Sequence, residues 1–176
     1  MKKKIVIING YPGSGKDTFI DQCQLLTKNV ERISIIDEVK RIARECGWYG
    51  LKRPKDRKFL CGLKDLLTEY NDLPIDAVVV AACDFVSEEN THNVLFVTMR
   101  QPDDIEKFKC VVPEAITLFI ERESAKLETL KLDPELKNDA DNGVEDYVYD
   151  YYISNNGTMD ELKVSAETFL KNLEVM

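Results

Sequence analysis

Residues 9–19 read NGYPGSGKDTF and directly follow the apolar run KIVII at residues 4–8. A short β-branched run of this kind is typical of a buried parallel strand. The residues after Lys16 carry apolar side chains at helical spacing, on the face that includes Phe19 and Ile20. The stretch therefore predicts a strand, a glycine-rich turn and a helix, in that order.

The turn matches the pattern G-x-x-x-x-G-K-[ST] at every position except the last. Glycines in such a turn let backbone N–H groups point inward at phosphate oxygens, and the helix start adds the positive end of its dipole. A tight turn without a ligand is the alternative, which the joint register of glycines, lysine, strand and helix disfavours. We expect the following residues to bind the phosphates of a nucleoside triphosphate: Gly10, Pro12, Gly13, Ser14, Gly15, Lys16, Asp17 and Thr18.

The last position of the pattern normally holds a hydroxyl that binds Mg²⁺, but here it is Asp17, and Thr18 comes one place later. If the loop were decayed, an acid among phosphates would repel them. If the loop belongs to a class that does not use this side chain for the metal, Asp17 can point outward or order water around Mg²⁺. We assign the metal to Asp17 and Thr18.

The composition is that of one domain of ordinary size, residues 1–176, with 44% hydrophobic and 32% charged residues. A net charge of −8 argues against non-specific binding to nucleic acid or to an anionic membrane. The five cysteines contain no C-x-x-C pair, which favours small buried side chains in a reducing cytoplasm over a disulfide or zinc framework. All seven arginines precede residue 123, so positive charge is gathered in one part of the chain.

The pattern of apolar residues alternates between strand and helix periods, which predicts an α/β fold with a five-stranded parallel sheet between two layers of helices. We predict strands at 4–8, 32–36, 94–99, 116–121 and 151–153. We predict helices from Lys16, from a cap at Asp37 to Gly47, through an apolar stripe that includes Phe59, Leu60, Leu63, Leu66 and Leu67, at 103–109, and after a capping box of Thr158 and Glu161.

Two segments are less regular. The stretch 75–86, IDAVVVAACDFV, suits a strand by its valines and a buried helix by its length, and we favour the helix. The stretch 122–148 is polar and contains Pro134, so we expect an irregular lid over the site.

The stretch GYPGSGKDT resembles the loops of nucleoside monophosphate kinases, and more closely those of phage-type deoxynucleoside monophosphate kinases and animal-type phosphomevalonate kinases, which carry SGKD. Three later stretches resemble segments of the same group, in the same order: KDRKFLCGLKDLLTEYND, VLFVTMRQPDDIEKF and NDADNGVEDYVYDYYISNNGT. The resemblance covers nearly the whole chain. It implies a P-loop kinase that moves the γ-phosphoryl of ATP, with Mg²⁺, to a phosphate on a small acceptor.

Such a reaction needs cations more than a general base, because an acceptor phosphate is already a nucleophile. Arg100, at the end of a predicted strand beside the loop, is our candidate for binding the acceptor or transferred phosphate. The alternative is an ordinary surface charge at the end of a strand. Arg122 opens the lid and is the third catalytic candidate, after Lys16 and Arg100. The lid has no further arginine, whereas lids of this class generally supply them.

The remaining candidates have structural alternatives of similar weight. Asp37 faces the acceptor or caps a helix, and Arg41 and Arg57 bind the acceptor or are solvated surface charges. Asn156 and Gly157 line the adenine or form a plain turn before the last helix.

The leading prediction is a cytoplasmic kinase of a (deoxy)nucleoside monophosphate, with a small-molecule phosphate acceptor as its partner. A non-nucleotide acceptor of the phosphomevalonate or dephospho-coenzyme A type is the runner-up. A nucleotide-binding regulator or slow ATPase is the other class, favoured by the lack of an aspartate at the end of the 94–99 strand.

Overall fold

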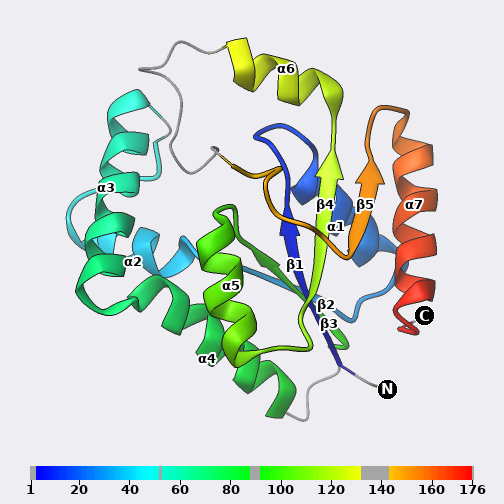
Figure 1. Cartoon of the computed structure of the whole chain (residues 1–176), viewed down its shortest axis with the longest axis horizontal. Coiled ribbons are helices and arrows are strands. Elements are labelled where there is room, and N and C mark those ends of the chain that lie inside the picture. Colours follow the sequence, from blue (N-terminus) through cyan, green and yellow to red (C-terminus); the bar gives the residue numbers. More distant parts are fainter. Residues whose placement is uncertain (1–2, 52, 88–91, 132–142, 176) are drawn as a thin grey trace.

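The computed structural model in Figure 1 describes residues 3–51, 53–87, 92–131 and 143–175. Within these ranges the chain forms a five-stranded, all-parallel sheet in the order β2-β3-β1-β4-β5. The strands are β1 (Lys4–Asn9), β2 (Val30–Ser34), β3 (Val94–Thr98), β4 (Ile116–Glu121) and β5 (Tyr151–Ser154). The described helices are α1 (Lys16–Leu26), α2 (Asp37–Glu45), α3 (Pro54–Asn71), α4 (Leu73–Ser87), α5 (Pro102–Val111), α6 (Glu123–Lys131) and α7 (Met159–Asn172).

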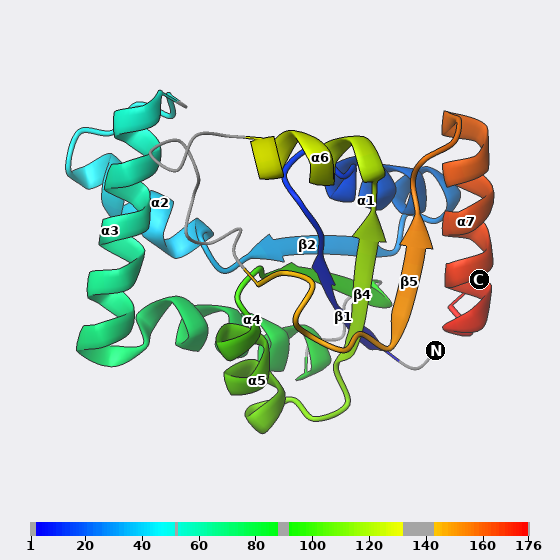
Figure 2. The same cartoon turned by 45° about the horizontal axis from the view of Figure 1, so that its top comes forward.

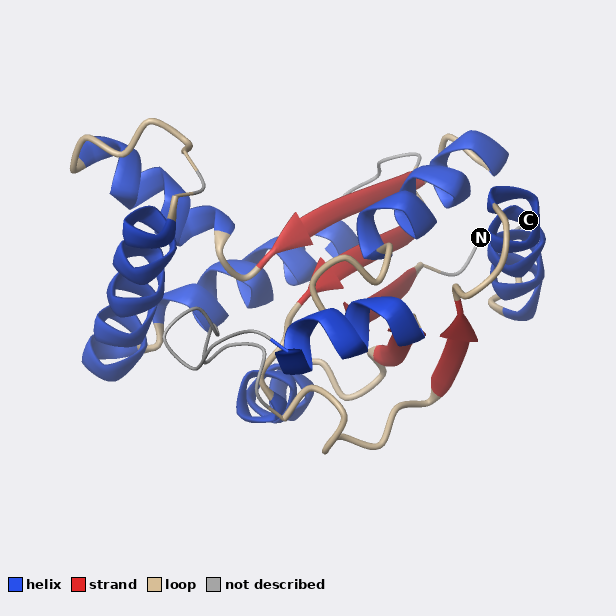
Figure 3. Ribbon diagram, turned by 90° about the horizontal axis from the view of Figure 1, so that it is seen from above, coloured by secondary structure: helices blue, strands red, loops and turns tan. Residues whose placement is uncertain are grey.

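The central strand β1 is buried on both faces, which explains its unbroken apolar run. Ile5 and Ile7 point into a core that α4 and α5 cover, whereas Val6 and Ile8 point into a second core under α1 and α7. Successive side chains of a strand point to opposite faces, so one run of sequence supplies both cores. Figure 3 shows the sheet between these helices, so the predicted three-layer α/β/α fold is confirmed.

The second core contains three phenylalanine rings that the sequence places far apart. Phe19 of α1 lies with its ring centroid 5.8 Å from that of Phe169 of α7 and 6.3 Å from that of Phe96 of β3. Edge-to-face packing at these separations is favourable beyond the area buried. The rings fix α1, and with it the turn that precedes α1, on the sheet.

Several local predictions are confirmed. The stretch 75–86 lies within α4, and the capping box at the start of α7 is present, since Thr158 Oγ1 accepts from Glu161 N at 3.3 Å while Glu161 Oε2 accepts from Thr158 N at 2.7 Å. Gly47 follows the end of α2 with φ of 86°. This left-handed conformation is one that glycine adopts without cost.

The predicted irregular lid is wrong for residues 123–131, which form α6. Residues 143–148 do follow without helix or strand. Pro134 of the predicted lid lies outside the described residues. The polar composition of 122–148 misled the prediction because α6 buries only one narrow side, with Ala125 and Thr129.

The cap predicted at Asp37 is also wrong. Helix α2 begins at Asp37, its N-cap residue is Ile36, and the Asp37 carboxylate instead accepts a hydrogen bond from Ser34 N at 2.8 Å. The preceding strand is also shifted, to Val30–Ser34 from the predicted 32–36. The turn at 35–36 uses the two residues that the sequence pattern assigned to the strand.

The predicted inward stripe of α3 is wrong at two positions, because Phe59 is 39% and Leu66 is 63% exposed. Figures 1 and 3 show α2 and α3 at the end of the molecule opposite α7, where the sheet does not cover them. The most buried side chains of α3 are the polar ones of Asp56 and Lys64. A helix packed only against other helices buries a narrower face than its apolar pattern suggests.

The cysteines are free, as predicted, but only Cys23 is buried, and burial raises the pKa of its thiol to about 12. Cys46, Cys83 and Cys110 are exposed, contrary to the predicted burial. Across the described ranges, no helix is both long and apolar enough to cross a lipid bilayer.

Candidate phosphate-binding site

The turn between β1 and α1 is closed by three glycines with positive φ: 145° at Gly10, 77° at Gly13 and 95° at Gly15. Two of these positions also exclude a side chain sterically. A β-carbon on Gly10 would lie 2.4 Å from Ile120 O, and one on Gly15 would lie 2.2 Å from Asn155 Nδ2. The turn is thus a tight backbone loop at the C-terminal edge of a parallel sheet, where ligands of this fold class bind.

Lys16 begins α1 and is only 8% exposed. Its Nζ donates to Gly10 O at 2.6 Å and to Tyr11 O at 2.9 Å, so the ammonium lies against the first part of the loop. Ser14 is fully buried, and its Oγ has no hydrogen-bond partner among the described residues. An unsatisfied buried hydroxyl is costly, by about 1–3 kcal/mol, and it lies inside the loop predicted to bind phosphates.

Asn9, which sequence reasoning missed, connects this loop to Arg100. The fully buried side chain of Asn9 accepts from Gly10 N through Oδ1 at 2.8 Å. Its Nδ2 donates to Arg100 O at 2.9 Å and to Tyr149 Oη at 2.7 Å. Burial raises the pKa of Tyr149, which keeps the hydroxyl protonated, and it donates to Val144 O at 2.8 Å. The signal in the sequence was a polar residue at the end of an apolar strand, which must find partners when buried.

The segment that carries Arg100 is also held by a second set of polar side chains, which sequence reasoning missed as well. Gln101, the residue after Arg100, accepts a hydrogen bond from Lys64 Nζ of α3. Lys64 Nζ also lies 2.8 Å from Asp104 Oδ2 in the first turn of α5. The signal here was a lysine inside the apolar stripe of a helix, where its charge requires a partner.

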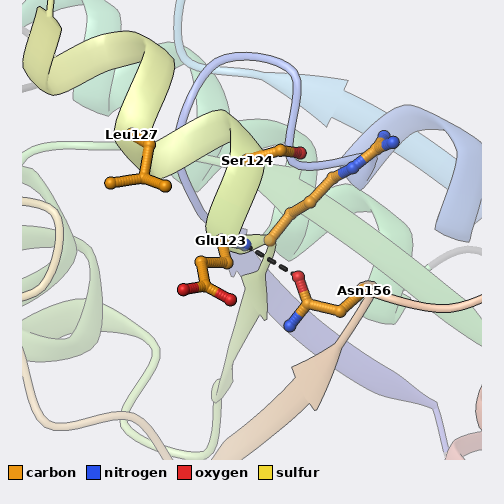
Figure 4. Close-up of a pocket in the computed structure, with 5 residues that line it drawn as sticks. Glu123, Ser124, Leu127 and Asn156 are labelled. Atoms are coloured by element: carbon orange, nitrogen blue, oxygen red, sulfur yellow. Dashed lines mark hydrogen bonds between the residues drawn. The ribbon is translucent and has the colours of Figure 1, made fainter.

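The turn after β5 packs directly on the loop. Asn155 Nδ2 donates to Ser14 O at 2.8 Å, and Asn155 N donates to Glu121 O at 2.7 Å. Asn156 Oδ1 accepts from Glu123 N at 2.8 Å, which ties the turn to the start of α6 (Figure 4). The turn predicted to line the adenine therefore lies between the loop after β1 and α6.

A pocket of about 360 Å³ opens beside this turn, with one apolar and several polar side chains around it. It is lined by Arg122, Glu123, Ser124, Leu127 and Asn156 (Figure 4). Two residues predicted from the sequence for different tasks, Arg122 and Asn156, thus share one pocket. Gly157 follows, and a β-carbon there would lie 2.2 Å from Glu161 Oε2, the acceptor of the α7 capping box.

Helix α6 covers the loop from above, as Figures 1 and 2 show. A β-carbon on Gly13 would lie 3.9 Å from Ala125 Cβ. Lys126 of α6 pairs with Glu145 at 2.7 Å. Burial and the negative charge of Glu145 raise the pKa of Tyr11 in the loop. Two segments therefore contact the loop: α6, which precedes residues 132–142, and the stretch around Glu145, which follows them.

The two predicted metal residues lie on different sides of the first turn of α1. Thr18 is partly buried, whereas the Asp17 side chain is 87% exposed and lies 3.9 Å from Arg32. Across the described residues no three acidic, histidine or cysteine side chains gather into a metal-binding group. Mg²⁺ in kinase sites commonly has only one or two protein ligands besides phosphates and water, so the ion does not require such a group of three side chains.

Two of the three candidate acceptor residues on α2 and α3 pair with neighbours on their own helix. Asp37 pairs with Lys40 at 3.3 Å, and Arg41 binds Glu38 with its Nη2 2.8 Å from Oε1. This pairing lowers the pKa of Glu38 through the hydrogen bond from Arg41. Arg57 is exposed near the start of α3. All three lie on the side of the molecule where α2 and α3 stand (Figure 1).

The fold is that of the P-loop kinases. Among solved structures, the chain is similar to shikimate kinase from Acinetobacter baumannii in complex with shikimate, with 14% identity, a TM-score of 0.54, and coverage of 98% of this chain and 93% of that one. It is also similar to shikimate kinase from Aquifex aeolicus, with 16% identity, a TM-score of 0.53, and coverage of 97% and 98%. Shikimate kinase from Bacteroides thetaiotaomicron gives the same four values as the Aquifex protein.

No protein-family model matches the chain, and no curated protein matches it in sequence. At identities this low, structural similarity establishes the shared fold, and activity must be argued from the site.

Proposed function

We propose that the chain is an ATP-dependent kinase that transfers the γ-phosphoryl group to the phosphate of a (deoxy)nucleoside monophosphate. One observation carries the proposal. Asn9 binds Gly10 N on one side and Arg100 O on the other, so a phosphate loop and an arginine stand at the same edge of the sheet, joined by one buried side chain. A site for two phosphate-bearing molecules needs such a second cation beside the loop.

On the donor side, the loop N–H groups, the start of α1 and Lys16 bind the ATP phosphates. The unpartnered Ser14 Oγ and the glycine positions that exclude a β-carbon support this assignment. Leu127 and Asn156 offer an apolar surface and an amide to the adenine, and Arg122 of the same pocket extends the positive charge. Mg²⁺, held beside Thr18 and Asp17, neutralises phosphate charge when bound.

On the acceptor side, Arg100 orients the acceptor phosphate and stabilises the charge that develops during transfer. No general base is required, because that phosphate is already ionised and nucleophilic. The basic and acidic side chains of α2 and α3, Asp37, Arg41 and Arg57, bind the remainder of the acceptor. This requires Arg41 to exchange its bidentate contact with Glu38 for the acceptor.

A second candidate, a kinase of a non-nucleotide acceptor, is favoured by the names of the similar structures, which are shikimate kinases. Asp37 pairs with Lys40, and Arg41 pairs with Glu38. These local ion pairs favour the second candidate too, because they occupy the two side chains that would otherwise bind a nucleobase. The resemblance to phosphomevalonate kinases names one such acceptor class, and dephospho-coenzyme A is another.

A coupled assay of ADP release separates these proposals. The panel contains ribo- and deoxyribonucleoside monophosphates, phosphomevalonate, dephospho-coenzyme A and shikimate, and a Lys16→Ala variant reports contaminating activity. ADP release stimulated by a nucleoside monophosphate supports the first proposal, and stimulation only by another panel member supports the second. Slow ADP release that no acceptor changes would contradict both and favour a regulator or ATPase.

A further inference from the structure

We propose that Asn9 is a positioning residue that holds the phosphate loop and Arg100 in one fixed relation. The inference rests on the proposed function for its catalytic consequence. Its structural basis is independent: Asn9 is fully buried, and the three hydrogen bonds of its amide reach three different segments. The segments are the loop after β1, the chain after β3 and the chain before β5.

The asparagine side chain suits this task because it offers an acceptor and two donors on one short amide, which few other side chains do. One oxygen accepts from Gly10 N while one NH₂ group supplies two donors, to Arg100 O and Tyr149 Oη. Aspartate has no donor when ionised, leucine has no polar atom, and glutamine is longer by one methylene. Every polar atom of the amide is satisfied, so the side chain has a single orientation.

A second route leads from Asn9 to the top of the loop. Tyr149 Oη accepts from Asn9 and donates to Val144 O. The next residue, Glu145, pairs with Lys126 of α6 and interacts with Tyr11 of the loop. Asn9 therefore holds the loop directly at Gly10 and indirectly through Tyr149, while it holds Arg100 by its carbonyl.

A separate contact also fixes the segment after β3 that carries Arg100. Lys64 Nζ of α3 donates to Gln101 in that segment. Asn9 fixes the segment toward the loop, whereas Lys64 fixes it toward the acceptor side. A displacement of about 1 Å between reacting groups lowers turnover by as much as about a hundredfold. We therefore infer that Asn9 sets the distance between the loop and Arg100, the two groups proposed to bind phosphates.

The test compares Asn9→Leu with Thr117→Val. The control also removes side-chain hydrogen bonds to a segment distant in the sequence. Thr117 is 1% exposed, and its Oγ1 donates to Asp150 Oδ2 at 2.8 Å and accepts from Asp150 N at 2.9 Å. Thr117 is in the first half of β4, whereas Gly10 of the loop lies beside Ile120, near the end of that strand. Both variants are first compared by urea unfolding, so that their stability losses are known.

The first readout is hydrogen exchange of backbone amides, which needs no substrate. We expect Asn9→Leu to speed exchange about tenfold or more in the segments 9–16 and 99–102 together, and Thr117→Val to leave both within about twofold. Unchanged exchange in either segment of Asn9→Leu would overturn the proposal. So would equal acceleration in Thr117→Val at matched stability.

The second readout is turnover in a cycle with Arg100→Ala. Asn9→Leu is expected to lower kcat about tenfold or more in the wild-type background, and by no more than about threefold when Arg100 is already absent. Equal losses in the two backgrounds would overturn the link to Arg100. If the wild-type chain phosphorylates no acceptor, the proposed function fails, whereas the exchange experiment still decides the role of Asn9.

A milder variant keeps the test decisive if Asn9→Leu does not fold. Tyr149→Phe removes one acceptor of Asn9 and the donor to Val144 O, and it retains the ring contact with Phe119 at a centroid separation of 5.0 Å. We expect exchange in segment 9–16 to rise about threefold, with a smaller rise in 99–102. No change in either segment would overturn the proposal.

Discussion

Lys64 Nζ lies 2.8 Å from Asp104 Oδ2, and neither residue is more than 8% exposed. This pair joins α3 to α5, and Lys64 also contacts Gln101, the residue after Arg100. A buried ion pair adds little net stability, but removing one partner leaves the other charge desolvated. The pair therefore sets where α3 stands more than how stable the fold is.

Lys64→Met is expected to lower the free energy of unfolding by about 3–5 kcal/mol, because it leaves the Asp104 carboxylate buried without its partner. Urea unfolding monitored by tryptophan fluorescence measures the loss. The double variant Lys64→Met with Asp104→Leu removes both charges and is expected to recover most of it. A single variant as stable as the wild type would contradict the account of the pair.

Lys16→Ala is expected to lower phosphoryl transfer about a hundredfold or more while the midpoint of unfolding changes little. The Lys16 ammonium is bound to carbonyls of the loop rather than to the hydrophobic cores, so its loss affects the site first. The coupled assay and urea unfolding provide the two measurements. Near-normal turnover in this variant would refute the role assigned to Lys16.

The sequence predicted the sheet well because each strand is an apolar run with turn residues after it. It predicted the glycine-rich turn between β1 and α1 because one local pattern determines that turn. It failed on α3, whose exposed Phe59 and Leu66 follow the same apolar pattern as a core helix. The difference lies in how far α3 stands from the sheet, which is a tertiary property that local periodicity does not contain.

The candidate site was predictable only in part, for a similar reason. The contacts of Asn9 span up to 140 residues of sequence, and those of Lys64 span 40. Nothing local distinguishes these two side chains except a polar atom inside an apolar pattern. That mismatch was visible in the sequence, and it is the signal for a buried polar residue that needs partners.

Arg100→Ala is expected to lower turnover about a hundredfold or more and to leave the affinity for an ATP analogue within about threefold. In the proposed function the guanidinium acts on the transferred or acceptor phosphate, whereas the loop proposed to bind ATP is linked to the backbone carbonyl of Arg100 through Asn9. Calorimetry with the analogue and steady-state kinetics separate the two effects. A loss of ATP affinity with unchanged turnover would show that Arg100 lies on the donor side.

The capping box of α7 is expected to make stability depend on pH in the acid range. Hydrogen bonds from Thr158 to Glu161 hold the pKa of that carboxyl below its ordinary value of 4.5. A group whose pKa is lower in the folded state stabilises it above the unfolded pKa, and this contribution is lost as pH falls through the folded pKa.

Glu161→Gln is the variant that tests this pH dependence, because it keeps the shape and an acceptor oxygen but cannot titrate. Wild type should lose stability between pH 4.5 and lower values more steeply than Glu161→Gln, as measured by thermal unfolding. Glu167→Gln is expected to flatten the profile in the same way, because Lys171 at the other end of α7 lowers the pKa of Glu167 too. Identical pH profiles of the wild type and Glu161→Gln would refute the assignment.

Asp17→Asn is expected to raise the Mg²⁺ concentration for half-maximal turnover about fivefold or more, because a carboxylate that orders water around the ion is replaced by a neutral amide. Asp21→Asn is the matched control. Asp21 lies one turn further along α1 and pairs with the same Arg32, at 3.3 Å compared with 3.9 Å for Asp17. Both variants remove a contact with Arg32, but only Asp17 lies in the first turn, beside the loop.

Thr18→Val completes the comparison of the two metal candidates. If the Thr18 hydroxyl is the direct ligand and Asp17 acts through water, Thr18→Val should raise the Mg²⁺ requirement more than Asp17→Asn does, while Asp21→Asn leaves it within about twofold. Titrations of turnover with Mg²⁺ at saturating ATP give all three values. An equal shift in Asp17→Asn and Asp21→Asn would trace the effect to the loss of pairing with Arg32, and Asp17 would then have no role at the metal.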